Sequence, residues 1–287
     1  MNYVELDIPV ADAELSEILV AELAELPYES FSSERNLLKA FIRQEELADC
    51  KEETDEVLAR YGVVGQRYVQ IESQNWNALW ESNFEEVHID DRIVIRAPFH
   101  APHPELGPMD IVITPRMAFG TGHHSTTALM VQAIADSDMQ GLRVLDMGSG
   151  TGVLAIVALK RGAAWADAVD IDDAACDSCL ENFSQNGIDA CGFGRQANDR
   201  CRAEVLLGDV RCVANRRYDL ILANINRNIL LRDMEAYASM LNPGGRLFVS
   251  GFLEQDIEAL CDCAAANNLR TDNIRTRDGW VAIRFFN

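Results

Sequence analysis

The residues best suited to hold a ligand form a glycine-rich turn within Val144–Gly152, which reads VLDMGSGTG. An apolar run leads into the turn, and the helical pattern of Val153–Arg161 follows it. Gly148, Gly150 and Gly152 allow the main chain to turn sharply and allow a ligand to lie against backbone atoms. A strand, a tight glycine turn and a helix in this order are typical of a nucleotide-type binding site.

The residues around the glycines narrow the choice of ligand. A dinucleotide site has a third glycine where Val153 stands, and the lysine and hydroxyl of a phosphate loop are absent after Gly152. Asp170 follows the turn by about 20 residues, where a carboxylate can accept hydrogen bonds from ribose hydroxyls. We therefore expect a ligand that carries a ribose and lacks a diphosphate. The alternative is an ordinary glycine turn without a ligand.

The sequence VLDMGSGTG followed by AVDID resembles the cofactor site of class I S-adenosylmethionine-dependent methyltransferases. By this resemblance, Gly148 lines the methionine part of the cofactor, Gly150 belongs to the same binding turn, and Asp170 holds the ribose. Asp209 follows a strand predicted at Ala203–Leu207, and the wider superfamily implies that it meets the adenine amino group. An aspartate that only shapes a turn is the alternative for Asp209.

A second glycine stretch lies upstream, at Met117–Ala128. Its glycines predict a flexible loop, and Ser125 is expected to cap a helix that runs to about Ala135. The N-terminus of such a helix suits an anion such as the carboxylate of the cofactor. The adjacent His123 and His124 are poor joint metal ligands, so we expect them to order the loop.

The segment AFGTGHHSTTAL, placed just upstream of VLDMGSGTG, resembles the signature of the PrmA family of ribosomal protein methyltransferases. These enzymes modify the eleventh protein of the large ribosomal subunit. The resemblance extends over nearly the whole chain and is strongest from Met117 to Gly251. It implies that S-adenosylmethionine is the cofactor and that the following residues contact it: Phe119 near the reactive end, Thr127, Gly148, Asp170 and Asn224.

A third informative stretch is Tyr218–Ile225, which reads as a buried strand ending in Asn224. The carboxyl ends of parallel strands share one sheet edge, so Asn224, Asp170 and the glycine turn are expected to converge there. An asparagine side chain can accept a hydrogen bond from an amine without adding charge, and we expect Asn224 to be catalytic. Enzymes that methylate planar nitrogens resemble one another in having two prolines and an aromatic residue after this asparagine. Here Ile225, Asn226 and Arg227 follow instead, which favours an aliphatic amine as the acceptor.

Three parts of the chain are expected, in an α/β protein of the class I methyltransferase fold. Residues 1–71 read as strand, helix, two strands, helix and strand, the order of a small ferredoxin-like α+β domain that recognises the substrate. Residues 72–90 read as a linker helix with Trp76 and Trp80 on one face. Residues 91–287 are expected to form the methyltransferase domain, with a Rossmann-like seven-stranded sheet and a final antiparallel hairpin.

The composition bounds the setting and the partners. The 287 residues carry a formal charge of −21, which disfavours stable nucleic-acid binding and favours a basic ribosomal protein of the large subunit. No apolar run approaches the roughly 20 residues of a membrane span, and no signal peptide is recognised. We therefore expect a cytoplasmic monomer without a membrane partner.

The eight cysteines lack the spacing of a disulfide framework and are expected to be free thiols. Cys176 and Cys179 form a CxxC pair, which admits a zinc or redox interpretation. The only comparable pair, Cys261 and Cys263, lies far down the chain. We therefore expect no metal site.

The function expected from these observations is methyl transfer from S-adenosylmethionine to amines of a large-subunit ribosomal protein, at lysine side chains and/or the N-terminal α-amine. One alternative is a methyltransferase of the same fold that acts on RNA or a small molecule. A second alternative is a non-catalytic cofactor-binding factor that assists ribosome assembly.

Overall fold

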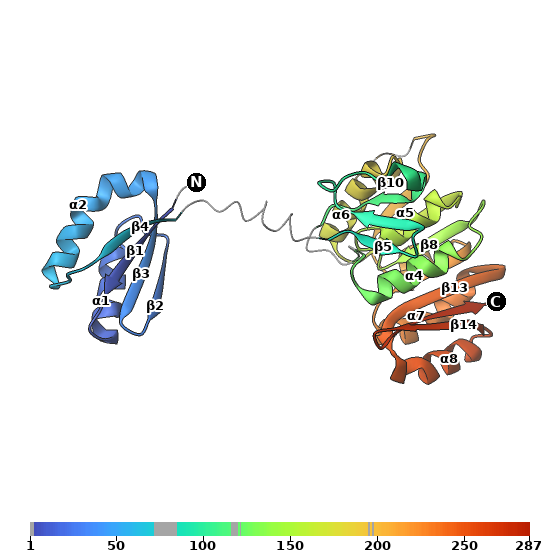
Figure 1. The fold of residues 1–287 in the computed structure, drawn as a ribbon. Coiled ribbons are helices and arrows are strands. Elements are labelled where there is room, and N and C mark those ends of the chain that lie inside the picture. The colour runs from blue at the N-terminus through green and yellow to red at the C-terminus, as the bar shows by residue number, and fades with distance from the viewer. Residues whose placement is uncertain (1–2, 72–84, 116–119, 121, 195, 197) are drawn as a thin grey trace. The chain divides into compact units, whose positions relative to one another are not determined.

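The structure is a computed structural model that describes residues 3–71, 85–115, 120, 122–194, 196 and 198–287. The chain divides into two compact units, residues 1–84 and 85–287 (Figure 1). Each unit buries its own apolar core, so each is stabilised by its own packing.

The N-terminal unit is a four-stranded antiparallel sheet with two helices. Its strands pair in the order β2-β3-β1-β4, as expected for a ferredoxin-like domain. Burial alternates along β1 and β3, so one face of each strand packs into the core. The elements are β1 (Tyr3–Pro9), α1 (Ala13–Leu23), β2 (Ser30–Glu34), β3 (Leu37–Arg43), α2 (Gln44–Arg60) and β4 (Arg67–Ile71).

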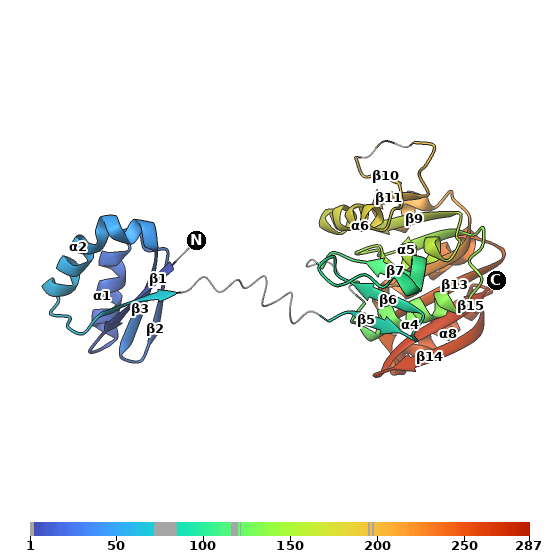
Figure 2. The same cartoon turned by 45° about the horizontal axis from the view of Figure 1, so that its top comes forward.

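The predicted linker helix at 72–90 falls largely outside the described residues, which resume at Glu85. Its last part is not helical. Val87–Ile89 form strand β5, which pairs antiparallel with β6 (Ile93–Arg96), and β6 pairs with β7 (Asp110–Val112). This short sheet belongs to the second unit and packs near α4 and α5 (Figure 2).

The second unit is built on a mostly parallel sheet of eight strands in the described part of the chain. The order is β10-β11-β9-β8-β12-β13-β15-β14, with β15 antiparallel to both of its neighbours. The predicted final hairpin is therefore confirmed. The strands are β8 (Arg143–Met147), β9 (Trp165–Asp170), β10 (Ala190–Gly192), β11 (Ala203–Leu207), β12 (Tyr218–Asn224), β13 (Leu241–Leu253), β14 (Arg270–Arg277) and β15 (Trp280–Phe286).

The prediction of seven strands was wrong by one edge strand. Strand β10 lies in the polar segment 189–202 and pairs in parallel with β11. The pairing depends on Gly192, because a Cβ atom there would lie 2.2 Å from the carbonyl oxygen of Val205. Residues Asn242–Gly245 lie inside β13, where its register against β12 shifts.

Helices cover both faces of the large sheet. One core joins the sheet to α4, α5, α6 and the short sheet, and a separate core joins its other face to α7 and α8. The sheet edge is thus left as the place where strand ends are open to a ligand. The helices are α4 (Ser125–Ala135), α5 (Val153–Lys160), α6 (Asp173–Gln185), α7 (Arg227–Met240) and α8 (Ile257–Ala266). Within the described residues, no helix is both long enough and apolar enough to cross a membrane.

Candidate active site

Three predicted site residues lie in one row at the carboxyl edge of the large sheet. Met147 at the end of β8 is flanked by Val169 of β9 on one side and Ala223 of β12 on the other. The next residue of each strand therefore emerges at the same level. These three residues are Gly148, Asp170 and Asn224.

The glycine turn requires glycine for both conformation and space. Gly148, Gly150 and Gly152 have φ angles of 68°, 51° and 78°, a region that other residues rarely adopt. A Cβ atom on Gly148 would lie 2.3 Å from Cγ2 of Ile225, and one on Gly152 would lie 2.6 Å from the sulfur of Cys179. The turn is thus packed closely from two sides, which fixes the path of its backbone.

Asp170 is tied directly to this turn. One oxygen of its carboxylate accepts a hydrogen bond from the Gly150 amide at 2.8 Å, and the other accepts from the Asp172 amide at 3.1 Å. These bonds fix the orientation of the carboxylate at the end of β9. Each oxygen keeps a further lone pair that can accept from a ligand hydroxyl.

A cavity of about 440 Å³ opens beside the row. Gly148, Asp170 and Asp209 line it together, with apolar walls that include Ile171 and Ile225. The Ile171 side chain is 76% exposed, although it is large and apolar. Apolar walls with a few fixed acceptors are suited to a small ligand that has a flat apolar part and hydroxyl groups.

Asp209 is held in a tight ion pair at the mouth of this cavity. Its carboxylate accepts hydrogen bonds from the Arg211 side chain at 2.7–3.0 Å, and these bonds lower the pKa of Asp209 to about 2. Arg232 and Asp233, which also line the cavity, form a second pair at 2.6 Å. Asp209 is therefore a charged acceptor over the usual pH range, but it is already engaged.

The remaining predicted residues do not line the cavity. Thr127 is fully buried in α4, and Asn224 is half-buried at the end of β12. The Thr127 hydroxyl and the Asn224 amide oxygen are both buried and have no hydrogen-bond partner among the described residues. Buried polar atoms without partners are rare, because each costs free energy, so these two atoms are candidates for ligand contact. Phe119 lies outside the described residues.

Asp146, two residues before Gly148, was not predicted as a site residue from the sequence. Its side chain is fully buried, and one oxygen accepts a hydrogen bond from the Ala155 amide at 3.1 Å. Burial raises the pKa of Asp146 to about 7, and the nearby charge of Asp170 adds to that increase. The sequence feature that could have identified it is a carboxyl group among the apolar residues at the end of the strand.

Thr151 joins the two glycine stretches. Its hydroxyl donates a hydrogen bond to the Gly120 carbonyl oxygen at 2.7 Å. The carbonyl of Thr151 in turn accepts from the Asn182 side chain at 2.9 Å, and the same side chain accepts from the Thr114 amide at 2.9 Å. Thr151 and Asn182 therefore hold Gly120 and Thr114 in place.

The prediction that Ser125 caps α4 was wrong by one residue. His124 is the capping residue, because its Nδ1 accepts a hydrogen bond from the Thr126 amide. The Ser125 hydroxyl donates instead to Asp278 in the turn of the final hairpin, at 2.7 Å. The ring of His124 also stacks edge-on against Trp280 at 4.6 Å, so the hairpin and α4 hold each other in place.

The CxxC pair is buried in α6. Burial raises the pKa of Cys176 to about 11 and raises that of Cys179 as well, so both are held as thiols. All eight cysteines are free. In the parts of the chain that the structure describes, no group of three or more His, Cys, Asp and Glu side chains is arranged to hold a metal ion.

The sheet order, the antiparallel β15 and the glycine turn beside an acidic strand end define the class I methyltransferase fold. The family model of the ribosomal protein L11 methyltransferase (PrmA) matches residues 8–287. The chain therefore belongs to the ribosomal protein L11 methyltransferase family and is a methyltransferase. The family and the fold class predicted from the sequence are both confirmed.

Individual relatives agree with this assignment. The ribosomal protein L11 methyltransferase of Porphyromonas gingivalis is 42% identical over 275 residues, which cover 94% of this chain and 90% of that protein. The one from Symbiobacterium thermophilum is 35% identical over 217 residues, which cover 76% of this chain and 67% of that protein. The crystal structure of a ribosomal protein L11 methylase from Lactobacillus delbrueckii subsp. bulgaricus superposes with a TM-score of 0.62 at 26% identity, over 70% of this chain and 98% of that one.

Proposed function

We propose that this enzyme transfers methyl groups from S-adenosylmethionine to amine nitrogens of ribosomal protein L11, at lysine side chains and/or the N-terminal α-amine. The observation that carries the proposal is the buried amide oxygen of Asn224, which has no partner among the described residues and lies beside Gly148 and Asp170. The names of the relatives support the ribosomal protein as the methyl acceptor.

The residues present fit this cofactor. Gly148 provides a backbone surface without a side chain, and Asp170 provides a fixed carboxylate with lone pairs for the two ribose hydroxyls. In the proposal Gly150, Thr127 and Phe119 contribute further contacts. Asp209 accepts from the adenine amino group only if its pairing with Arg211 leaves one lone pair free. Bound S-adenosylmethionine supplies an electrophilic methyl group on a sulfonium.

The residues of this chain then have to present a neutral amine in the right direction. A lysine amine has a reference pKa of about 10.4 and an α-amine one of about 7.7–8.0, so the amine must lose a proton before it can attack. The Asn224 amide oxygen accepts a hydrogen bond from the amine and so directs its lone pair. A buried, uncharged acceptor also leaves the ammonium form without a counter-charge, and this lowers the pKa of the amine.

The test is to incubate the full chain with ribosomal protein L11 and S-adenosylmethionine carrying a labelled methyl group. We expect the label in the protein and mass increases in steps of one methyl group, located by peptide mass spectrometry at lysine residues or at the N-terminus. Label in RNA would contradict the proposal and favour a nucleic-acid methyltransferase. Cofactor binding without any turnover on L11 would favour a non-catalytic role in assembly.

The two units take different parts in this proposal. In this proposal the second unit, residues 85–287, carries out the transfer, and residues 1–71 recognise the substrate protein. Support for the division comes from the site residues, because every described one lies in the second unit. The first unit has its own core and adds none of these residues.

A further inference from the structure

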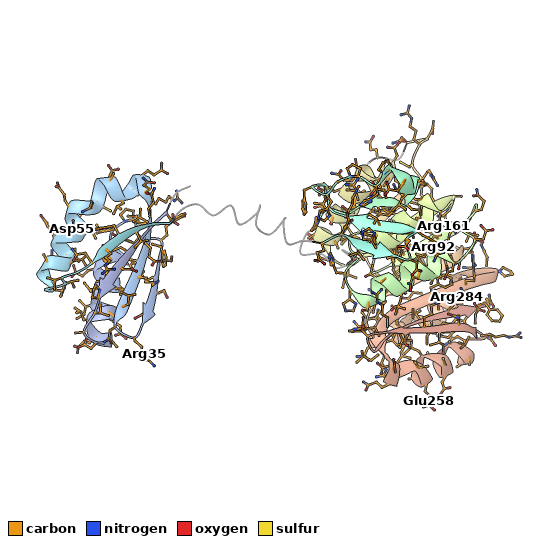
Figure 3. All side chains as sticks on the ribbon, in the orientation of Figure 1. Arg35, Asp55, Arg92, Arg161, Glu258 and Arg284 are labelled. Carbon is orange, nitrogen blue, oxygen red and sulfur yellow. The ribbon has the colours of Figure 1, made fainter. Side chains whose placement is uncertain are left out.

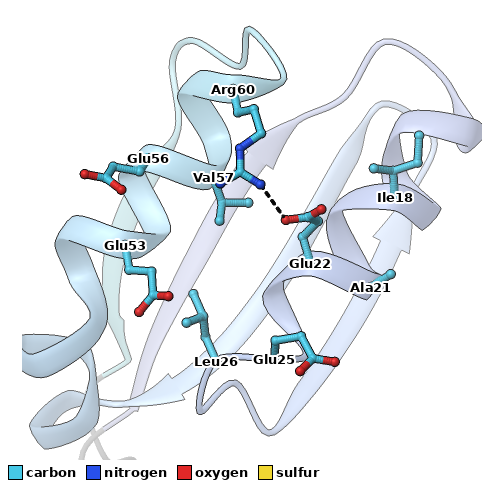
Figure 4. Close-up of a pocket in the computed structure, with 9 residues that line it drawn as sticks. All are labelled: Ile18, Ala21, Glu22, Glu25, Leu26, Glu53, Glu56, Val57 and Arg60. Atoms are coloured by element: carbon cyan, nitrogen blue, oxygen red, sulfur yellow. Dashed lines mark hydrogen bonds and ion pairs between the residues drawn. The ribbon is translucent and has the colours of Figure 1, made fainter.

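A groove runs between α1 and α2 on the surface of the N-terminal unit (Figure 4). Its volume is about 480 Å³, and its floor is apolar, with Leu26 and Val57 at its base. Ile18 stands at one side of the groove with 38% of its surface exposed. The groove can therefore bury an apolar side chain of a partner.

The rim of the groove is acidic. Figure 4 shows Glu22 and Glu25 on the side of α1 and Glu53 and Glu56 on α2. Only Glu22 is neutralised, by the guanidinium of Arg60 at 3.1 Å, and it also accepts from the Tyr61 hydroxyl at 3.0 Å. This pairing links the two helices across the groove.

The other three rim acids form no ion pair within the described part of the chain, in contrast to Asp55 and Glu5 of the same unit. Asp55, on another side of α2 (Figure 3), is bound by Lys51 and by the Tyr68 hydroxyl at 2.7 and 2.8 Å. On the sheet, Glu5 pairs with Lys39. The rim of the groove therefore carries uncompensated negative charge.

The charge of the whole unit points the same way. Residues 1–84 contain 18 Asp and Glu but only 6 Lys and Arg, a formal charge of −12 out of −21 for the chain. Such a surface attracts cationic protein segments and repels the phosphates of RNA. The apolar floor adds short-range contact to this long-range attraction.

We propose that the groove between α1 and α2 docks a basic segment of the substrate protein, with an apolar side chain on Leu26 and Val57 and Lys or Arg side chains against Glu25, Glu53 and Glu56. This inference rests on the proposed function and adds to it the surface that selects the substrate. The groove contributes to substrate affinity and does not take part in methyl transfer.

The test compares two triple variants of the full chain that remove the same charge, each at one acid in or just after α1 and at two acids in α2. The groove variant carries Glu25→Gln, Glu53→Gln and Glu56→Gln. The control variant carries Glu17→Gln, Glu45→Gln and Glu52→Gln, which are exposed but do not line the groove. Steady-state kinetics with ribosomal protein L11 and calorimetric binding of S-adenosylmethionine are measured for both, and circular dichroism checks their folding.

We expect the groove variant to raise KM for the protein substrate about 10-fold at low salt, since each ion pair at an exposed rim contributes modestly. Its kcat and its affinity for S-adenosylmethionine should match those of wild type. The control should change KM less than 2-fold. The difference should shrink in 0.5 M salt, where exposed charges are screened.

A separate variant, Ile18→Ser, tests the apolar contact with the substrate rather than the electrostatic attraction. We expect it to raise KM about 3-fold at either salt concentration. If the groove variant and the control have the same KM in an active enzyme, the groove inference is wrong and the proposed function stands. If wild type does not methylate L11 at all, the proposed function fails, and the inference fails with it.

Discussion

The sheet-edge cavity and the groove on the N-terminal unit are built in opposite ways. The cavity at the edge of the large sheet is shaped by backbone, with glycines at positive φ and a carboxylate fixed by two main-chain amides. The groove on the N-terminal unit is shaped by side chains, with unpaired glutamates around an apolar floor. A small cofactor of fixed shape suits the cavity, because a closely packed backbone holds its atoms in fixed positions. A protein segment suits the groove, because surface charge attracts a partner of opposite charge and disfavours other partners.

This difference predicts how each hollow responds to substitution. In the sheet-edge cavity, one added methyl group moves the backbone, so effects should be large and insensitive to salt. In the groove, each acid contributes a little, so effects should be small, cumulative and reduced by salt. The following variants test the first half of the comparison, from the largest expected effect to the smallest.

Gly148→Val should have the largest effect. Valine disfavours the φ of 68°, and its Cβ would lie 2.3 Å from Ile225. We expect binding of S-adenosylmethionine to weaken by at least about 100-fold, because strain and overpacking each cost about 1–3 kcal/mol. Calorimetry measures the binding. The matched control is Gly244→Val, where φ is also positive but a Cβ meets nothing within 4 Å; equal loss in both would show that φ alone matters.

Asn224→Ala tests the proposed catalytic residue. Removal of its amide oxygen should lower kcat about 100-fold, the cost expected when the attacking group is no longer oriented. The Kd for S-adenosylmethionine should change less than kcat, and single-turnover kinetics with calorimetry separate the two. Equal loss of turnover and cofactor affinity would reassign Asn224 to cofactor binding.

Thr151→Val removes the hydroxyl that holds the Gly120 carbonyl and keeps the shape of the side chain. We expect kcat/KM to fall about 5-fold, as for one neutral hydrogen bond. Thr151→Ser keeps the hydroxyl and should retain most of the activity. If Thr151→Ser were as impaired as Thr151→Val although it keeps the hydroxyl, the hydrogen bond to Gly120 would not explain the loss.

Asp146→Asn should change how Tm varies with pH, and the difference in Tm from wild type should amount to a few degrees. Burial raises the pKa of Asp146 to about 7 in the folded chain, above the value of about 3.9 for an unfolded aspartate. The folded state therefore keeps a proton that the unfolded state releases, and this contribution to stability is lost as the pH rises towards 7. Asparagine remains neutral, so the Tm of the variant minus that of wild type should grow between pH 5 and pH 8. Parallel melting profiles would contradict a buried neutral Asp146.

The position of three predicted residues at one sheet edge could be read from the sequence because backbone requirements restrict residue type. Glycines at fixed positions after an apolar run, followed by an acid and then an asparagine at later strand ends, could be placed in one row by the topology of parallel strands alone. The register of β8, β9 and β12 puts Gly148, Asp170 and Asn224 in that row.

Other features depend on packing that residue types do not reveal. Strand β10 has only three residues and exists because Gly192 fits against Val205. The cap of α4 could be His124 or Ser125 by residue type, and the choice was decided by Asp278, which is 153 positions away from Ser125. The groove is lined by acids of α2 and acids in or just after α1. Their spacing along the chain is the same as on any solvent-exposed helix face, so the sequence does not reveal the groove.

The most direct test of the account is calorimetric titration of S-adenosylmethionine into wild type, Asp170→Ala and the control Asp172→Ala. Asp172 is an acid two residues further on that caps α6 and does not line the cavity. We predict tight binding to wild type and Asp172→Ala, and a loss of at least about 30-fold in Asp170→Ala, because two charged hydrogen bonds are removed. Undiminished binding to Asp170→Ala, or no binding to wild type, would contradict the account.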